Sequence, residues 1–523
     1  MTNPARALPA ERGLPLLSSW LRRVLEVDPR ARALTFEETD HSWSYFAESV
    51  TDLDTLLREH PAARRVGIVL RNRPGHLAAV LATIATGRQI VTLSPHVGDA
   101  GLAEDVEALR PDVLVADEQD WAREPVLRAA ERIAAISLVV SGEHRLRAHP
   151  APWRPAPAGL PTEDVAVLMM TSGTTGKPKR VALTYTHLTS AFTSAGTLLG
   201  EDGEPRLRKG TVILWSALTH ISGLYFAISN AVEGRTVALM ERFEVHAWAR
   251  LVVTHRPRVL RLPPTAIRMV LQADVPPEVF SGVRALGSGT APLPPELGEQ
   301  FEARYGIPVL ATYGATEFAG AIAGWTLADH QEWGKSKRGS VGRPHHGIEL
   351  RVIDKDTGAV LPAGSTGLLE ARGPQLPAAD DAWVRTTDLA SQDEDGFLFI
   401  HGRADEAINR GGFKIPPSVI EDALRAHPAV TDAAAVGLPD ERLGEVPAVA
   451  VTVGAETTEQ ELLDHLAARL TRYQMPVALR IVDQLPRTPS MKVGRPQVRD
   501  LFAARVDAPK VIPASRLPET TAG

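Results

Sequence analysis

The sequence predicts an α/β protein with layered parallel sheets, a small antiparallel unit and a compact α+β segment at its C-terminal end. Short runs rich in β-branched residues recur between residues 66 and 287, and amphipathic stretches separate most of them. This alternation is typical of parallel sheets covered by helices. After about residue 340, short strands joined by Gly and Pro turns indicate antiparallel pairing, and beyond residue 412 helix and strand patterns mix in one compact segment.

The first elements along the chain are a strand at 66–70, a helix at 76–87 and a strand at 89–93. The apolar residues of the helix recur on one face, and Gly87 stands where a C-terminal cap belongs. Because this apolar run is too short to span a bilayer, we predict a buried helix. Further strands are predicted at 113–116, 137–140, 166–170, 212–215, 236–240, 258–262 and 283–287.

The C-terminal part of the chain has a different pattern. The strands of the antiparallel unit are "IELRVID", "GLLEARG" and "GFLFIHG". In the α+β segment "AAAVG" and "PAVAVTVG" are strands, and a helix is predicted over 459–472, where four leucines line up on one face. Residues 506–523 are Pro-rich and aperiodic, which predicts a flexible tail.

Composition excludes several classes of protein. At 523 residues the chain exceeds the size at which one hydrophobic core stops growing, so two or more domains are expected. A net charge of −6 with scattered basic residues argues against a nucleic-acid partner. The absence of cysteine excludes disulfides and thiolate metal sites, so the sulfur of any thioester must come from a partner. The N-terminus lacks the apolar core of a signal peptide, and we expect a cytoplasmic protein without membrane insertion.

One loop has an unusual composition: residues 171–179 read "TSGTTGKPK". Glycines after a strand offer backbone N–H groups to an anion, and hydroxyls and lysine add donors and positive charge, so a polyphosphate is the natural ligand. A Walker loop has four residues between its glycines and Ser or Thr after its lysine. Here only two residues separate Gly173 from Gly176, and Lys177 is followed by Pro178. The loop is therefore not a P-loop, and composition alone leaves a flexible surface turn as the alternative.

This loop resembles the phosphate loop of the adenylate-forming superfamily, which includes acyl- and aryl-CoA synthetases, peptide-synthetase adenylation domains and luciferases. Six further family motifs follow in the family's order, and their wording is most similar to acyl-CoA synthetases. They are "THISGL" (219–224), "GSGTAPL" (287–293), "YGATE" (313–317), "GSVGRP" (339–344), "RTTDLASQDEDGFLFIHGRADEAINRGG" (385–412) and "LPRTPSMKVGR" (485–495). The resemblance covers roughly residues 35 to 500.

The resemblance implies a fold and a reaction. The expected domains are an N-terminal domain, 1–404, that includes the antiparallel unit as a small barrel, and a mobile C-terminal domain, 405–505, before the tail. The expected chemistry joins a carboxylate to the α-phosphorus of ATP, with Mg²⁺, and then transfers the acyl group from AMP to the thiol of CoA. Since carboxylate and polyphosphate are both anions, the first step needs fixed positive charge and oriented donors.

Nucleotide-binding roles follow from the motifs. The resemblance implies that Tyr313 stacks on adenine, Thr316 donates to a phosphate and Glu317 ligates Mg²⁺, a hard ion completed by phosphates and water. The other implied nucleotide-binding residues are Thr171, Ser172, Gly173, Thr174, Thr175, Gly176 and Lys177 for the phosphates, Gly287, Ser288, Gly289, Thr290 and Gly314 around the base, and Asp388 and Arg403 at the ribose.

Lys492 is the implied catalytic lysine, which bridges the carboxylate and the α-phosphate in the transition state. The family has Gly before this lysine, whereas this chain has Met491, which would cost about 1 kcal/mol if the position needs a positive φ. Asp405 matches the hinge on which the small domain turns. Gly411 and Gly412 match the channel for the thiol, where bare backbone lies close to a pantetheine arm.

The substrates are less narrowly specified. His220 aligns with the gate of the acyl pocket, and the stretch 212–224 contains no acidic residue, which disfavours an α-amino acid. Small residues after Glu317, namely Ala319, Gly320 and Ala321, leave room for an aryl or medium-length acyl group. For the acceptor we favour CoA. A carrier protein or a non-thiol nucleophile is the alternative, and an inactive nucleotide-binding homologue is a third.

Overall fold

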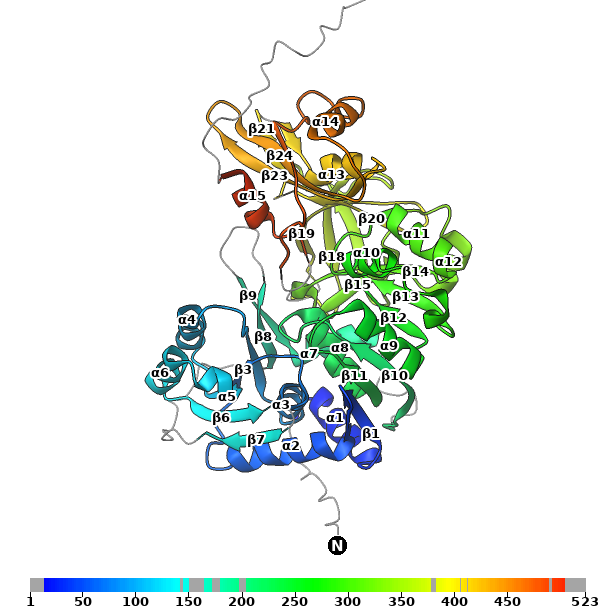
Figure 1. Cartoon of the computed structure of the whole chain (residues 1–523). Coiled ribbons are helices and arrows are strands. Elements are labelled where there is room, and N and C mark those ends of the chain that lie inside the picture. Colours follow the sequence, from blue (N-terminus) through cyan, green and yellow to red (C-terminus); the bar gives the residue numbers. More distant parts are fainter. Residues whose placement is uncertain are drawn as a thin grey trace, which may run out of the picture. The chain divides into compact units, whose positions relative to one another are not determined.

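The computed structural model describes residues 14–141, 144–149, 164–171, 179–196, 204–377, 382–404, 406–411, 413–488 and 492–503. The chain divides into two compact units (Figure 1). The first comprises Met1–Leu350, Ala371–Val384 and Asp395–Leu398, and the second Arg351–Glu370, Arg385–Glu394 and Phe399–Gly523. Each unit is described by itself below. The domain boundary predicted after residue 404 stays a prediction.

The first unit contains a seven-stranded sheet whose inner strands are parallel and whose two edge strands are antiparallel to their neighbours. The predicted parallel layer is therefore a mixed sheet. Its order is β7 (His144–Ala148), β6 (Ile136–Ser141), β5 (Val113–Ala116), β3 (Arg65–Val69), β4 (Gln89–Leu93), β8 (Val165–Thr171) and β9 (Lys179–Thr184). Helix α4 (Asp99–Leu109) packs on α6 (Glu124–Ile133), and the short α5 (Glu118–Trp121) follows β5.

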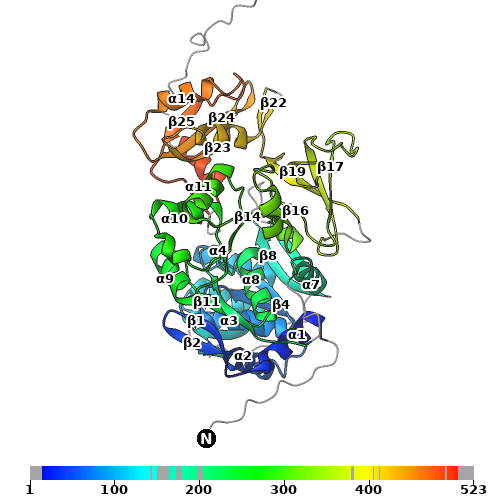
Figure 2. The same cartoon turned by 90° about the vertical axis from the view of Figure 1, so that its right-hand side faces the viewer.

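Helix α3 (Pro74–Ala85) is buried along its whole length. The buried helix predicted from the apolar run is confirmed, and Gly87 follows it with φ +65°. Its burial has a structural cause, because α1 (Leu16–Val27) and α2 (Trp43–Leu56) pack on it and on each other, as Figures 1 and 2 show.

A second sheet joins segments that are far apart in the sequence. Its order is β10 (Arg208–Leu214), β11 (Arg235–Leu239), β1 (Arg32–Phe36) and β2 (Thr39–Ser42). Strand β1 runs parallel to β11, with Leu34 opposite Val237. Helices α7 (Tyr185–Ser194) and α8 (Ile221–Val232) bury their apolar residues in the same core.

A third sheet carries most of the predicted nucleotide motifs. Its order is β12 (Val259–Arg261), β13 (Ala285–Ser288), β14 (Val309–Ala315), β15 (Gly320–Gly324) and β16 (Arg343–Pro344). The first three strands are parallel, so their carboxyl ends lie at one edge. An aromatic core lies under the helices α9 (Val245–His255), α10 (Pro264–Gln272) and α11 (Pro295–Tyr305). The 3₁₀ turns η1 (Pro277–Phe280) and η2 (Thr316–Phe318) and helix α12 (Leu327–Trp333) complete this region.

The antiparallel unit expected after residue 340 contains a four-stranded sheet. Its order is β17 (Glu349–Ile353), β18 (Gly367–Arg372), β19 (Val384–Gln392) and β20 (Leu398–Arg403).

The C-terminal segment is α+β, as predicted. Its sheet has the order β22 (Phe413–Ile415), β21 (Ile408–Arg410), β24 (Gly444–Val453) and β23 (Val430–Asp440), and β25 (Ala478–Ile481) also pairs with β24. Helices α13 (Pro417–Arg425), α14 (Glu459–Ala467) and α15 (Arg495–Ala503) accompany it. Helix α14 ends at Ala467, earlier than the predicted residue 472. None of the helices in the described part of the chain has the length and apolarity needed to cross a membrane.

Candidate active site

Two predicted nucleotide motifs meet at the carboxyl edge of the third sheet. Ser288 of β13 lies opposite Ala311 of β14, and Thr312 Oγ1 donates to the Ser288 carbonyl over 3.3 Å. A Cβ on Gly289 would lie 2.6 Å from Thr312 Oγ1, so this close approach requires glycine. The pairing of β13 with β14 therefore places "GSGT" beside "YGATE", in the position where ligands bind to open α/β sheets.

The chemistry of this edge fits a purine nucleotide. Ser288 is buried, and in the described part of the chain its hydroxyl has no hydrogen-bond partner. A buried hydroxyl without a partner is costly, and a base nitrogen would satisfy it. Two residues after Ser288, Thr290 turns the backbone with φ +69°. Tyr313 is partly buried, with its ring centroid 6.4 Å from that of Phe318.

Thr316 and Glu317 form the 3₁₀ turn η2 directly after β14. Thr316 is partly buried and Glu317 is exposed. A Cβ on Gly314 would fall 2.2 Å from the Gly320 carbonyl oxygen, so the chain folds back tightly on β15 and directs the turn outward. No cluster of three metal-ligating side chains occurs in the described residues. One exposed carboxylate suits Mg²⁺ whose other ligands are phosphates and water.

The predicted acyl gate lies next to these motifs. His220 is the N-cap residue of α8 and is partly buried. Helix α8 packs against β15, where a Cβ on Gly320 would lie 3.1 Å from the Tyr225 ring. Ala319 is fully buried in the core of the first unit, so the prediction that it lines the acyl pocket is wrong. Gly320 and Ala321 are partly buried.

The predicted ribose residues lie on neighbouring strands of the second unit. Asp388 is on β19 and Arg403 ends β20. Arg403 Nη2 donates to Thr387 Oγ1 over 2.6 Å, and the Asp388 amide donates to Thr386 Oγ1 over 3.0 Å. Arg403 therefore contacts the residue that precedes Asp388 in β19.

Lys492 is exposed and lies in the second unit directly before Val493, which forms an antiparallel bridge with Arg487. The Thr488 amide donates to the Lys492 carbonyl over 2.8 Å, and the Gly494 amide donates to the Pro486 carbonyl over 2.9 Å. Gly411 has φ +55°, and its amide donates to the Leu443 carbonyl over 2.7 Å.

The remaining predicted positions lie outside the described residues. Strands β8 and β9 pair in antiparallel fashion at both ends of the phosphate loop, with Thr171 opposite Lys179. The positions outside the described residues are Ser172, Gly173, Thr174, Thr175, Gly176, Lys177, Asp405, Gly412 and Met491.

Sequence comparison identifies the family. The family model "AMP-binding enzyme" matches residues 21–377, and the model "AMP-binding enzyme C-terminal domain" matches residues 419–492. The chain belongs to the AMP-binding enzymes. It is thus a member of the adenylate-forming superfamily.

This AMP-binding enzyme is similar to curated CoA ligases. It is 34% identical to sulfoacetate–CoA ligase of Cupriavidus necator, covering 86% of this chain and 91% of that protein. It is 30% identical to 4-coumarate–CoA ligase 3 of Oryza sativa subsp. japonica, covering 93% of this chain and 94% of that protein.

Two solved structures have the same fold. ATP-bound MatB from Rhodopseudomonas palustris has a TM-score of 0.79 and 25% identity, covering 93% of this chain and 99% of that one. The amide bond synthetase McbA from Marinactinospora thermotolerans has a TM-score of 0.76 and 26% identity, covering 93% of this chain and 99% of that one.

Motif analysis of this AMP-binding enzyme did not find Asn72. Its side chain is buried and is hydrogen-bonded at both of its polar atoms. The two hydrogens of Nδ2 are shared among the carbonyl oxygens of Trp215, Ser216 and Met240 at 3.1, 3.0 and 3.1 Å, and Oδ1 accepts from the Leu218 amide over 3.0 Å. Asn72 thus fixes the loop that precedes His220 in the chain.

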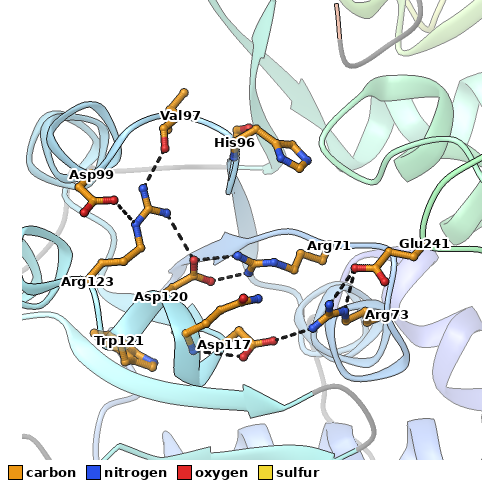
Figure 3. A network of polar contacts seen from close by, with 12 residues as sticks. Arg71, Arg73, His96, Val97, Asp99, Asp117, Asp120, Trp121, Arg123 and Glu241 are labelled. Atoms are coloured by element: carbon orange, nitrogen blue, oxygen red, sulfur yellow. Dashed lines mark hydrogen bonds and ion pairs between the residues drawn. The ribbon is translucent and has the colours of Figure 1, made fainter.

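The two residues that flank Asn72 in the sequence, Arg71 and Arg73, form ion pairs (Figure 3). Arg71 contacts Asp120 through two bonds of 2.5 and 2.9 Å, and Arg73 contacts Glu241 at 2.8 Å and Asp117 at 3.5 Å. The arginines follow the carboxyl end of β3, and Asp117 and Asp120 follow that of β5. The strand order reverses between these two strands, which is the usual place for a ligand in such a sheet. Since the arginines here are paired with carboxylates, we interpret the cluster as structural.

Proposed function

We propose that this protein is an AMP-forming acid–thiol ligase that activates a carboxylic acid with ATP and transfers the acyl group to CoA. The observation that carries the proposal is the meeting of Gly287–Thr290 with Thr316 and Glu317 at one sheet edge, beside His220. The CoA-ligase relatives support the reaction class, since they match most of the chain.

Activation takes place at the α-phosphate. A carboxylate oxygen attacks the α-phosphorus, an O–P bond forms, the bridging P–O bond breaks and pyrophosphate leaves. The hydroxyls of Ser288 and Thr316 donate to the nucleotide, and Tyr313 covers the base. Lys492 carries positive charge to the oxygens that gain negative charge in the transition state. Mg²⁺ held by Glu317 would supply further charge neutralisation on the phosphates.

The acyl group then leaves AMP. The CoA thiolate attacks the acyl carbon, a C–S bond forms and the C–O bond to AMP breaks. The chain has no cysteine, so the thiol comes from the acceptor. Gly411, and with it Gly412, would let the pantetheine arm lie against bare backbone. The acid remains predicted as aryl or medium acyl.

A second candidate acceptor is a non-thiol nucleophile. It is favoured by the similarity to McbA, an amide bond synthetase whose chain this protein matches almost completely. In that reaction an amine displaces AMP and forms an amide. Transfer to a carrier protein would use the same acyl adenylate.

The test measures the two half-reactions separately. Carboxylate-dependent exchange of pyrophosphate into ATP should be seen with at least one acid of a panel. Mass spectrometry of the products should then show an acyl-CoA when CoA is present. Exchange without acyl-CoA, but with an amide when amines are supplied, would favour the second candidate. No exchange with any acid would contradict adenylation altogether.

A further inference from the structure

Arg261 occupies a position in the candidate site that none of the motifs covers. It is the last residue of β12 and lies opposite Gly287, the first residue of the "GSGT" motif. A Cβ on Gly287 would lie 3.6 Å from Arg261 Nη1, so the guanidinium extends across this glycine. Trp215 Nε1 donates to the Arg261 carbonyl over 3.2 Å.

The guanidinium also contacts the helix of the acyl gate. Its central carbon lies 4.2 Å from the ring centroid of Phe226, a cation–π contact. Phe226 belongs to α8, which begins directly after His220. Arg261 therefore touches the nucleotide motif on one side and the gate helix on the other.

Arg261 makes no direct contact with a carboxylate in the part of the chain that the structure describes. Within the described ranges no carboxylate forms an ion pair with it, and the nearby Glu233 pairs instead with Arg235 and Arg208. Arg261 as a residue is exposed to solvent. The protein atoms packed around its side chain nevertheless desolvate the guanidinium and lower its pKa. A guanidinium keeps its proton in proteins, so its five donors remain available to a ligand.

We propose that Arg261 binds a second anionic group of the substrate, so that the acid activated by this enzyme carries a carboxylate or sulfonate besides the reacting carboxylate. This inference rests on the proposed function. Arginine suits the role because its planar fork makes paired hydrogen bonds with such groups. Among the similar proteins, sulfoacetate is an acid of this kind, whereas 4-coumarate has a single carboxylate.

Matched acids test the inference. Pyrophosphate release is measured with sulfoacetate, succinate and glutarate, and with the monomethyl esters of the two dicarboxylates, which keep one carboxylate and lose the second charge. The wild type should prefer a diacid to its monoester by about 100-fold in kcat/KM, as expected for hydrogen bonds between charged groups.

Variants assign the preference to one residue. Arg261→Met should abolish the preference for the diacid and change the monoester rate less than about threefold, and Arg261→Lys should recover part of it. The KM values for ATP and CoA should stay unchanged. Arg258→Met is the matched control, since Arg258 is exposed and precedes β12 at its other end, and it should behave as wild type.

The outcomes separate the inference from the proposed function. Preference for the monoester, an equal loss for all acids in Arg261→Met, or a raised KM for ATP or CoA would overturn the role of Arg261 while leaving adenylation intact. Failure of every acid, including 4-coumarate and benzoate, to release pyrophosphate would overturn the proposed function itself.

Discussion

A single buried amide, Asn72, positions the loop that leads to the acyl gate. It links the end of β3 to backbone groups at residues 215, 216, 218 and 240. We predict that Asn72→Leu costs about 3 kcal/mol of folding free energy, because several buried backbone groups lose their partner. We also predict a rise on the order of tenfold in KM for the acid without a matching change for ATP, since a displaced gate misplaces the acid.

The control for this substitution is Asn230→Leu. Asn230 is buried too, but its amide makes one bond of 2.6 Å to the Phe226 carbonyl within the same helix. Asn230→Leu should cost about 1 kcal/mol of folding free energy. Denaturant unfolding and initial rates measure both effects. If Asn72→Leu lowers stability while KM for the acid stays at the wild-type value, Asn72 has no positioning role.

His76 predicts a pH dependence of stability. It is fully buried in α3, and neither ring nitrogen has a hydrogen-bond partner in the described residues. Burial, with Arg71 nearby, lowers its pKa from 6.5 to about 3. The unfolded chain therefore binds a proton below about pH 6.5 that the folded chain does not, so stability is present above this pH and is lost as pH falls towards about 3. At pH 5 the loss is about 2 kcal/mol.

The variant that tests this prediction is His76→Leu, which keeps an apolar group of similar size in place of the ring. Urea unfolding at pH 7 and pH 5 should show that the wild type loses about 2 kcal/mol more than the variant on acidification. Parallel losses in the two proteins would show that His76 does not titrate in this range.

Sequence reasoning found the residues that belong to contiguous motifs and missed those that act through distant neighbours. Ser288, Tyr313 and Glu317 stand within short recognisable segments. Asn72 is separated in the sequence from its hydrogen-bond partners by up to 168 residues. Arg261 is positioned by Phe226 of α8 and by Gly287 of β13, which are also distant in the sequence. No local pattern marks either residue, since the neighbours that give them a role are fixed only by the tertiary fold.

At the scale of elements, strands were predictable where the local pattern was strong. The predicted bounds of β4 and β5 agree with the structure, because both are continuous buried β-branched runs. Strand β1, "RALTF", was missed, since it depends on pairing with β11 some 200 residues later. Helix α14 ends at Ala467, and the chain beyond it continues as a turn in which the Arg469 amide donates to the Leu466 carbonyl, three residues back.

The chain on both sides of Lys492 is anchored by ion pairs within the second unit. Arg487 contacts Asp432 at 2.5 Å, and Arg495 contacts Glu421 at 2.8 Å and Glu406 at 3.1 Å. Asp432 and Glu421 are buried, so these pairs are protected from solvent. The exposed lysine thus lies next to a fixed base, an arrangement suited to presenting one charge.

Lys492→Ala should separate the two half-reactions. We expect adenylation to fall on the order of 100-fold or more, because charge on the phosphate oxygens loses its counter-charge. Thioester formation from supplied acyl adenylate should change little. Single-turnover assays of each step measure this, with Lys355→Ala, an exposed lysine of the same unit, as the control. An equal loss in both steps would contradict the assigned role.

At the scale of the whole molecule, the hydrophobic cores are separate in the two units. The clusters around α1–α3, α4–α6, α9–α11 and Phe318 lie in the first unit. The second unit has its own clusters under α13–α14 and beside α15. Because each unit packs a different set of core residues, the two units can unfold in separate steps.

We predict two calorimetric transitions. Leu466→Ala empties a fully buried position of α14, costs about 2–5 kcal/mol and should lower one transition by roughly 5–15 °C. Leu53→Ala, equally buried in α2, should lower the other. Because Lys492 belongs to the second unit, adenylation should be lost at the temperature of the transition that Leu466→Ala shifts. A single transition lowered by both substitutions would mean that the two cores unfold as one cooperative body.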